Sequence, residues 1–366
     1  MIDYNKKIKI LIEHLSSRAS ARVAQKVIKR SGLRTGRTLE DTIAYVECIK
    51  PDRAEVTYKK LLSSVEDFHL FGAKALRILK IKESEVENVK DFFESFVPNE
   101  DISSYKFYPK PLKESTLKKE SLHEPCFIKK YISPLGTLYV FSSRNIITLR
   151  DVFEGSDIDD FGLKNNEYDK IIAIKEKDIQ FFNSIFVHAD YEKIELRVDL
   201  ASVMGITVLK DVLDIFERKL DSLYFDKYKV PLPVGKVDLF PIIEKLYQTK
   251  DDGYVSELTF KCPTGANRTE TLSSYRKDLN VKDLRLEEYH VAGTKKIDNV
   301  FIPYKICVYW DSENTQGAVS GEPELMLSGS LIMSKSNAII LDYAIVNNTL
   351  AEKEFNYVIA AIHEYV

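Results

Sequence analysis

Cysteine is scarce in this sequence, and its spacing excludes two common structural uses. The four cysteines among 366 residues, Cys48, Cys126, Cys262 and Cys307, lie far apart and form no C-x-x-C pair. Zinc ribbons need such pairs, and disulfide frameworks need more closely spaced cysteines. The sequence therefore predicts a protein of a reducing compartment. We expect a cytoplasmic location, with no metal site and no cofactor.

Long apolar runs are also missing. No stretch approaches the ~18 consecutive apolar residues that a membrane helix requires, and the first residues, Met1 to Lys6, lead into mixed apolar and charged positions rather than a secretion signal. We therefore expect no membrane partner. The residues that are present, 44% apolar and 30% charged, are typical of a folded protein. At this length we expect two domains, or a core domain with a helical appendage.

Motifs that would identify an enzyme are absent as well. The segment 262–269 lacks the G-x-x-x-x-G-K-[ST] spacing of a phosphate loop. Ser320 stands one position too late for the G-x-S-x-G elbow of a hydrolase. The acidic stretch 151–160 fails the calcium-loop pattern, because Phe161 and Tyr168 occupy ligand positions. No catalytic residue is predicted, and a non-enzymatic protein is favoured.

One small cluster leaves an enzyme open as a third hypothesis. His188, Asp190 and Glu192 alternate along the sequence, and alternate residues of a strand share a face. They could act in acid–base or metal chemistry, as in an unrecognised nuclease or hydrolase. Residues 189–191 are typical of a turn, so exposed surface residues are the favoured interpretation.

The succession of patterns predicts an α+β protein in three regions. Residues 1–98 are expected to form a helical, basic N-terminal domain, with helices over residues 18–30, after Thr38, and over residues 83–97. Residues 99–125 lose apolar periodicity and contain prolines, which predicts a linker or a long loop. Residues 126–366 are expected to form a strand-rich α+β domain that ends in a helix.

Short alternating runs predict most elements of this third region. Strands are expected at residues 127–132, 137–141, 171–175, 179–188, 193–200, 254–262, 300–310, 324–333 and 338–346, and helices at 207–223, 239–248 and 350–365. The run 193–200 alternates most clearly. Ile194, Leu196 and Val198 fall on one face, while the charged residues 195, 197 and 199 fall on the other.

Charge is segregated along the chain. Residues 6–37 carry ten basic residues and one acid, Glu13, which is a local charge of +9. The whole chain has a net charge of −3, so the other residues carry −12. On a helix over residues 18–30, five basic residues lie within an arc of about 120°, and two more follow around the loop 32–36. The predicted nucleic-acid contacts are Arg18, Arg22, Lys26, Lys29, Arg30, Arg34 and Arg37.

Three interpretations of this basic face stay open. The first is a binding protein that contacts the phosphate backbone of DNA or RNA electrostatically. The second is a non-enzymatic subunit of a multi-protein assembly, for example in bacterial antiviral defence or toxin control, in which the face meets an acidic partner; an acidic surface of the same chain could fill that role too. The third is a solvated helix face without a function. The strand-rich remainder is expected to act as a scaffold or to form a homo-oligomer.

A secondary basic patch is predicted around a loop that contains glycine, asparagine and threonine. Its members are Lys261, Arg268, Arg276 and Lys277. An ordinary β-turn connection is the favoured alternative.

Overall fold

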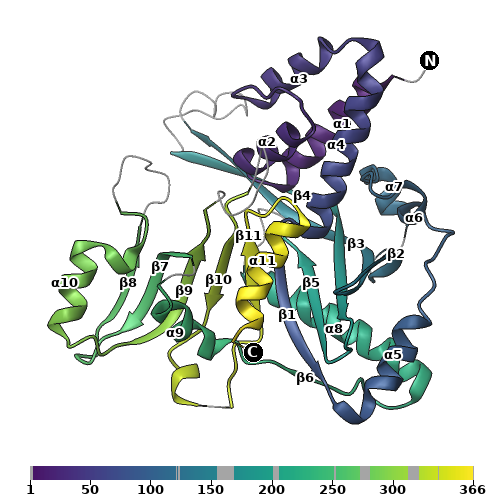
Figure 1. The fold of residues 1–366 in the computed structure, drawn as a ribbon. Coiled ribbons are helices and arrows are strands. Elements are labelled where there is room, and N and C mark those ends of the chain that lie inside the picture. Colours follow the sequence, from purple (N-terminus) through teal and green to yellow (C-terminus); the bar gives the residue numbers. More distant parts are fainter. Residues whose placement is uncertain are drawn as a thin grey trace.

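The computed structural model of the protein describes residues 3–120, 122, 124–154, 169–200, 206–250, 253–272, 281–311, 321–336 and 338–365. The predicted α+β class is confirmed: helices lie at both ends of the chain, and a large antiparallel sheet lies between them (Figure 1). Among the helices described, none is long and apolar enough to cross a membrane.

Four helices form an N-terminal bundle with its own core. They are α1 (Tyr4–Arg18), α2 (Ala21–Arg30), α3 (Leu39–Glu47) and α4 (Pro51–Phe71). Leu15, Val27 and Leu61 pack in the centre of this bundle and are fully buried. The Thr38 hydroxyl accepts the Asp41 backbone N–H at the start of α3, as a capping residue does.

The predicted helix over residues 18–30 is wrong at its start. Arg18 is the last residue of α1, Ala19 has extended backbone angles (φ −120°, ψ 157°), and α2 begins after Ser20. The Ser20 side chain accepts the backbone N–H of Val23 and so caps the new helix. Because the two helices are separate, Arg18 does not continue the basic side of α2.

In the part of the chain that the structure describes, the sheet has eleven strands. They are β1 (Lys74–Ile81), β2 (Cys126–Ser133), β3 (Gly136–Glu154), β4 (Lys170–His188), β5 (Lys193–Asp199), β6 (Val234–Lys236), β7 (Tyr254–Lys261), β8 (Asn267–Thr271), β9 (Ile302–Tyr309), β10 (Glu324–Ser328) and β11 (Ala344–Asn347). Their order is β2-β3-β4-β5-β1-β11-β10-β9-β7-β8, with β6 paired to β1 as well.

The prediction of an entirely helical N-terminal region is wrong for residues 74–81, because β1 is a central strand. It pairs with β5 on one side and with β11 and β6 on the other. The sequence up to residue 98 therefore contributes both to the bundle and to the sheet. The predicted strands 171–175 and 179–188 form one strand, β4, and β6 and β8 were not predicted.

The remaining helices pack on the sheet or connect its strands. They are α5 (Val86–Glu94), α6 (Ser103–Phe107), α7 (Glu114–Lys119), α8 (Ile206–Tyr228), α9 (Phe240–Gln248), α10 (Glu288–Lys296) and α11 (Glu352–His363). The segment predicted as a linker contains α6 and α7 and is packed, since Ser104 and Leu117 are each 1% exposed. The Leu112 backbone N–H also donates to Gln180 Oε1 on β4 at 2.8 Å.

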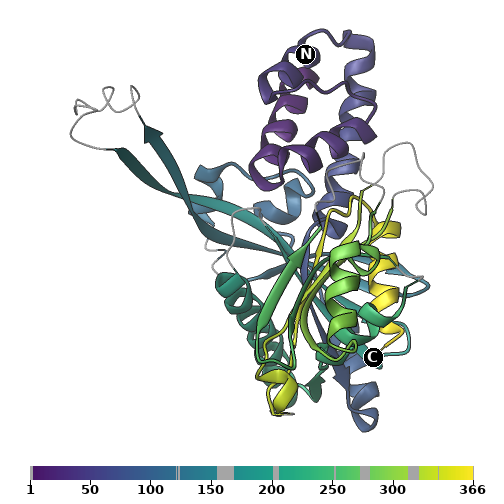
Figure 2. The ribbon, with the colours of Figure 1, turned by 90° about the vertical axis from the view of Figure 1, so that its left-hand side faces the viewer.

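Two helical layers enclose the middle of the sheet. Phe216 of α8 contacts Phe141 of β3 on one face. On the other face, the guanidinium of Arg197 on β5 lies over the ring of Phe355 on α11. The two views place α8 and α11 on opposite sides of the sheet (Figures 1 and 2). Both faces of β5 are therefore buried, and the charged side chains of this strand lie in the interior.

Strands β3 and β4 extend beyond their neighbours as a two-stranded ribbon. They pair with each other from Gly136↔His188 to Glu154↔Lys170. However, β2 pairs with β3 only as far as Ser142, and β5 pairs with β4 only from Ser184 onward. Figure 2 shows the outer part of this ribbon projecting from the rest of the protein.

Candidate functional site

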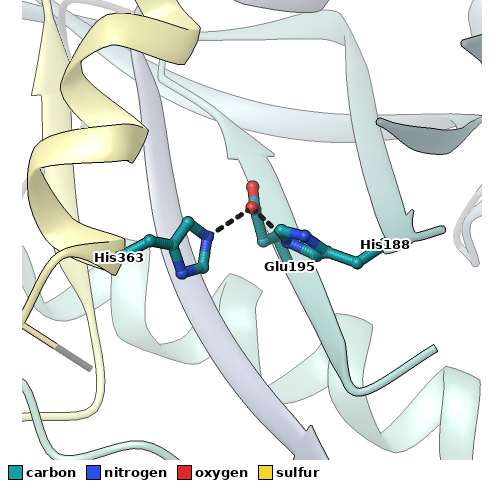
Figure 3. A group of neighbouring side chains, drawn as sticks. All are labelled: His188, Glu195 and His363. Atoms are coloured by element: carbon teal, nitrogen blue, oxygen red, sulfur yellow. Dashed lines mark hydrogen bonds and ion pairs between the residues drawn. The ribbon is translucent and has the colours of Figure 1, made fainter. Parts of the chain in front are cut away.

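Three side chains from distant parts of the sequence meet beside the end of β4. His188 is the last residue of β4, Glu195 lies on β5, and His363 is the last residue of α11 (Figure 3). Glu195 Oε1 accepts hydrogen bonds from His188 Nε2 at 2.8 Å and from His363 Nε2 at 3.0 Å. One ligand atom from each residue lies within 4.8 Å of the other two. We call these residues the His–Glu cluster.

The His–Glu cluster lies at the boundary between the interior and the solvent. The side chain of Glu195 is 0% exposed, whereas those of His188 and His363 are 21% and 19% exposed. Arg197 donates from Nε and Nη2 to Glu195 Oε2, at 2.9 and 2.7 Å. Burial by itself raises the pKa of Glu195, but Arg197 and the two imidazoles outweigh burial and hold this pKa well below its usual range.

This arrangement can serve in two ways. As hydrogen-bonded partners of Glu195 on β5, the two imidazoles join the end of α11 to the end of β4 through one buried carboxylate. Two imidazoles and one carboxylate are also a ligand set for transition metals. The arrangement therefore joins a structural role to a capacity for metal binding.

A second buried ionic cluster surrounds Asp199, four residues after Glu195 on β5. Its Oδ2 pairs with Arg18, and its Oδ1 lies 3.2 Å from Lys74 Nζ. Arg18 also donates to the backbone carbonyl of Gln180. The side chain of Arg18 is 2% exposed. Its prediction as a nucleic-acid contact is therefore wrong in this structure, because its guanidinium is buried and paired inside the protein.

Three other predicted contacts are paired with acids of the same chain. Arg22 Nη2 lies 2.6 Å from both carboxylate oxygens of Glu322, and Lys26 Nζ lies 3.6 Å from the same group. Arg30 lies 3.7 Å from Asp67. Both acids are partly exposed, so these pairs contribute weakly to stability. These pairs do lower the positive potential around α2. They agree with the alternative interpretation of the basic face, in which it meets acidic residues of the same chain.

The remaining three predicted contacts lie at the surface. Lys29, Arg34 and Arg37 are exposed. Arg34 lies over the ring of Tyr45, with 4.4 Å between the guanidinium carbon and the ring centroid. Among the residues that the structure describes, no carboxylate lies within 4.0 Å of any of the three cations. We call these three residues the cationic surface.

The secondary basic patch is not one surface. Lys261 stands opposite Asn267, and Arg268 stands opposite Phe260, so Lys261 and Arg268 point to opposite faces of the β7–β8 pair. Arg276 and Lys277 lie outside the described residues. The connection from Lys261 to Asn267 is a turn in which Cys262 N–H donates to the Ala266 carbonyl at 2.8 Å.

The His188–Asp190–Glu192 cluster, which was the less favoured interpretation, does not form, and Asp190 and Glu192 are exposed as the favoured interpretation expected. Asp190 Oδ1 accepts the backbone N–H of Glu192 at 2.9 Å, in a turn of the chain. His188 instead faces Glu195 and His363. The partners of His188 therefore come from the next strand and from the last helix described, and not from the turn that follows it.

A separate pocket of about 580 Å³ lies beside α9 and α10. Tyr247 and His290 line it, and the Tyr247 hydroxyl donates to His290 Nε2 at 2.9 Å. On its other side, His290 Nδ1 donates to the carboxylate of Glu270. Burial raises the pKa of Tyr247, so the phenol keeps its proton and is a poor nucleophile. The two hydrogen bonds hold the His290 ring in one orientation at the wall of the pocket.

Sequence reasoning missed Glu195 and His363 as partners of His188. Glu195 was placed correctly on the charged side of an alternating strand, but such alternation normally means exposure to solvent. His363 is a lone histidine near the end of an amphipathic helix, 168 residues from Glu195. No local pattern connects these residues, because the contact depends on where α11 lies against the sheet.

Comparison of the chain with models of protein families, with curated proteins and with solved structures found no match. No activity, ligand or partner is therefore transferred from another protein.

Proposed function

We propose that this protein is a non-enzymatic subunit of a protein assembly, and that it associates with a second copy of itself through the outer half of the β3–β4 ribbon. The observation that carries the proposal is a group of four exposed aliphatic side chains. Ile146, Val152, Ile172 and Ile174 are 56%, 55%, 49% and 65% exposed, respectively. We call these four residues the ribbon patch.

The ribbon patch lies on one face of the ribbon. Val152 stands directly opposite Ile172, and the Ile174 position stands opposite Arg150, two residues earlier on β3. Residues that are opposite each other, or two apart on one strand, point to the same side of an antiparallel pair. Ile146 follows the same alternation. The aliphatic groups therefore form one surface and not a scatter of single exposed residues.

The physical case for a covering partner rests on the isolation of this ribbon. A two-stranded ribbon by itself is marginally stable in water, because it cannot bury an apolar face. Beyond Ser142 of β3 and before Ser184 of β4, these two strands pair only with each other among the described strands. Exposed apolar patches and unpaired strand edges of this kind are typical of protein interfaces.

The charges around the ribbon patch favour a second copy as the partner. On the same face, three cations (Arg144, Arg150 and Lys170) are matched by three acids (Glu154, Glu176 and Asp178), so the charges cancel. A two-fold interface uses the same surface on both subunits, and such a surface must complement itself. A surface with balanced charges can do so, whereas a surface of one sign would repel its copy. A polyanion would find no net attraction here.

Sedimentation equilibrium over a dilution series tests the proposal. A reversible dimer is expected, with twice the chain mass of 42.1 kDa at high concentration. Changing both Ile172→Thr and Ile174→Thr should shift the equilibrium to monomer, because threonine keeps the β-branched shape but removes apolar surface. Ile132→Thr is the matched control, since Ile132 is 77% exposed on β2, away from the ribbon patch. A wild-type monomer at all concentrations, or equal effects of the two changes, would contradict the proposal.

A second candidate function, nucleic-acid binding, is supported by the cationic surface. Lys29, Arg34 and Arg37 are exposed without a carboxylate partner among the described residues. Three phosphate contacts on duplex DNA predict that log affinity falls with log salt with a slope of roughly −2.7. Mobility shifts with DNA and RNA across salt, beside a variant with all three changed to glutamine, test this candidate. A flat salt response, or unchanged binding by the variant, would exclude it.

A further inference from the structure

The geometry points to a binding site for one divalent first-row transition-metal ion at the His–Glu cluster, with His188 Nε2, His363 Nε2 and Glu195 Oε1 as ligands. The three atoms converge from two strands and a helix, and each is of a type that such ions bind. This site shares no residue with the ribbon patch or with the cationic surface.

The separations between the ligand atoms indicate the coordination geometry. Glu195 Oε1 lies 2.8 Å from His188 Nε2 and 3.0 Å from His363 Nε2. With bonds of about 2.1 Å, ligands at right angles lie about 3.0 Å apart, whereas tetrahedral ligands lie about 3.4 Å apart. The two separations from Oε1 to an imidazole nitrogen fit neighbouring corners of an octahedron, and the two imidazole nitrogens lie within 4.8 Å of each other. Two imidazoles and one carboxylate leave the other positions of an octahedron for water or a ligand.

The two carboxylate oxygens of Glu195 have different partners. Arg197 makes two hydrogen bonds to Oε2, so this oxygen is already engaged. Oε1 is the oxygen that faces both imidazoles. Hydrogen bonds from the protein to a ligating carboxylate normally orient it and support the metal. Arg197 therefore fixes the direction of Oε1, although its positive charge also opposes an incoming cation.

The imidazoles provide an entrance for the ion. Their side chains are 21% and 19% exposed, so the side of the site that they form is open to solvent. One outer contact is missing: His363 Nδ1 is buried without a hydrogen-bond partner among the described residues. Such outer partners usually contribute 10–100-fold to metal affinity. We therefore expect an affinity about that much weaker than in a fully supported site of the same three ligands.

Calorimetric titration of the metal-stripped, full-length protein with Co²⁺ tests the inference. One ion per chain is expected, with the weak visible absorption of six-coordinate cobalt. His188→Gln and His363→Gln should each abolish this binding. Glutamine keeps an N–H donor that can reach Glu195, so the hydrogen bond and the fold are preserved while the imidazole ligand is lost. Urea unfolding of each variant verifies that it is folded.

Glu192→Gln is the matched control, because Glu192 is an exposed carboxylate near His188 in the sequence that does not belong to the cluster. It should bind cobalt as the wild type does. If a glutamine variant fails to fold, X-ray absorption of the cobalt-loaded wild type decides, since two imidazole ligands give a characteristic scattering pattern. Absence of stoichiometric binding, binding that survives both histidine changes, or absorption without imidazole ligands would overturn the inference.

Discussion

Helix α2 and strand β5 carry charged residues at regular spacing, but the two elements place them in opposite environments. On α2, Arg22 and Lys26 share the partly exposed Glu322 at the surface. On β5, Glu195 and Asp199 are both buried, and every one of their carboxylate oxygens is engaged by neighbouring groups. Spacing reveals which side chains share a side of an element, whereas the surrounding helices decide whether that side meets water.

The energetic consequence of this difference is large. Surface pairs are solvated both when they are formed and when they are broken, so each contributes little. A buried charge that loses its partner has no water to replace it, so breaking a buried pair is costly. The charges of β5 should therefore control stability, while those of α2 should control the surface potential.

The largest expected effect is from Asp199→Asn. This change removes the carboxylate between Arg18 and Lys74, which leaves two buried cations without their acid. A loss of about 3–5 kcal/mol in the free energy of unfolding is expected. Urea denaturation measures it. Asp67→Asn, which breaks the partly exposed pair with Arg30, is the control and should cost less than about 1 kcal/mol. Equal losses would refute the distinction between the two regions.

Acidification should lower the free energy of unfolding through the buried groups near Asp199. His14 and His69 lie 2.8 Å apart (Nε2 to Nε2) beside the Asp199 cluster, and burial, with Arg18 nearby, lowers the pKa of both well below 6.5. Below pH 6.5 the unfolded chain binds protons that the folded chain does not, so stability falls as pH falls. Between pH 7.5 and 5.5 the loss should reach up to about 1.4 kcal/mol for each histidine.

Unfolding curves at the two pH values measure this loss. The double variant His14→Gln, His69→Gln should show a flatter pH response than the wild type, whatever its absolute stability. An identical pH response in the two proteins would show that these histidines do not carry the effect.

The smallest effect on stability is expected at the surface, from Glu322→Gln. Its two pairs are with side chains that are 44% (Arg22) and 23% (Lys26) exposed, so the free energy of unfolding should change by less than about 1 kcal/mol. The positive charge near α2 rises by one unit. The variant should therefore elute from heparin at higher salt than the wild type, if the cationic surface binds polyanions. Elution at the same salt concentration would show that α2 takes no part in polyanion binding.

Local chemistry allowed several elements to be predicted correctly. The apolar stripe in residues 207–223 gave α8, and Thr38 followed by Glu40 and Asp41 marked the start of α3. The hairpin β2–β3 followed from a turn with proline and glycine. In each case the deciding interactions lie within a few residues of one another, so the sequence contains them directly.

Strand β1 shows where local reasoning failed. The apolar residues at positions 75, 78 and 79 also fit the spacing of one side of a helix. Its extended form depends on pairing with β5 and β11, which lie more than 100 residues away in the sequence. The same holds for the His–Glu cluster, whose members come from β4, β5 and α11.

The sequence by itself determined the α+β class, most helices and strands, and the separation of charge along the chain. Tertiary structure alone decided that α11 covers the charged face of β5, that Arg18 is buried against Asp199, and that the ends of β3 and β4 project from the protein. The physical reason is distance. Caps, turns and apolar stripes act over one or two turns of chain, whereas burial and ion pairing depend on segments that meet only after folding.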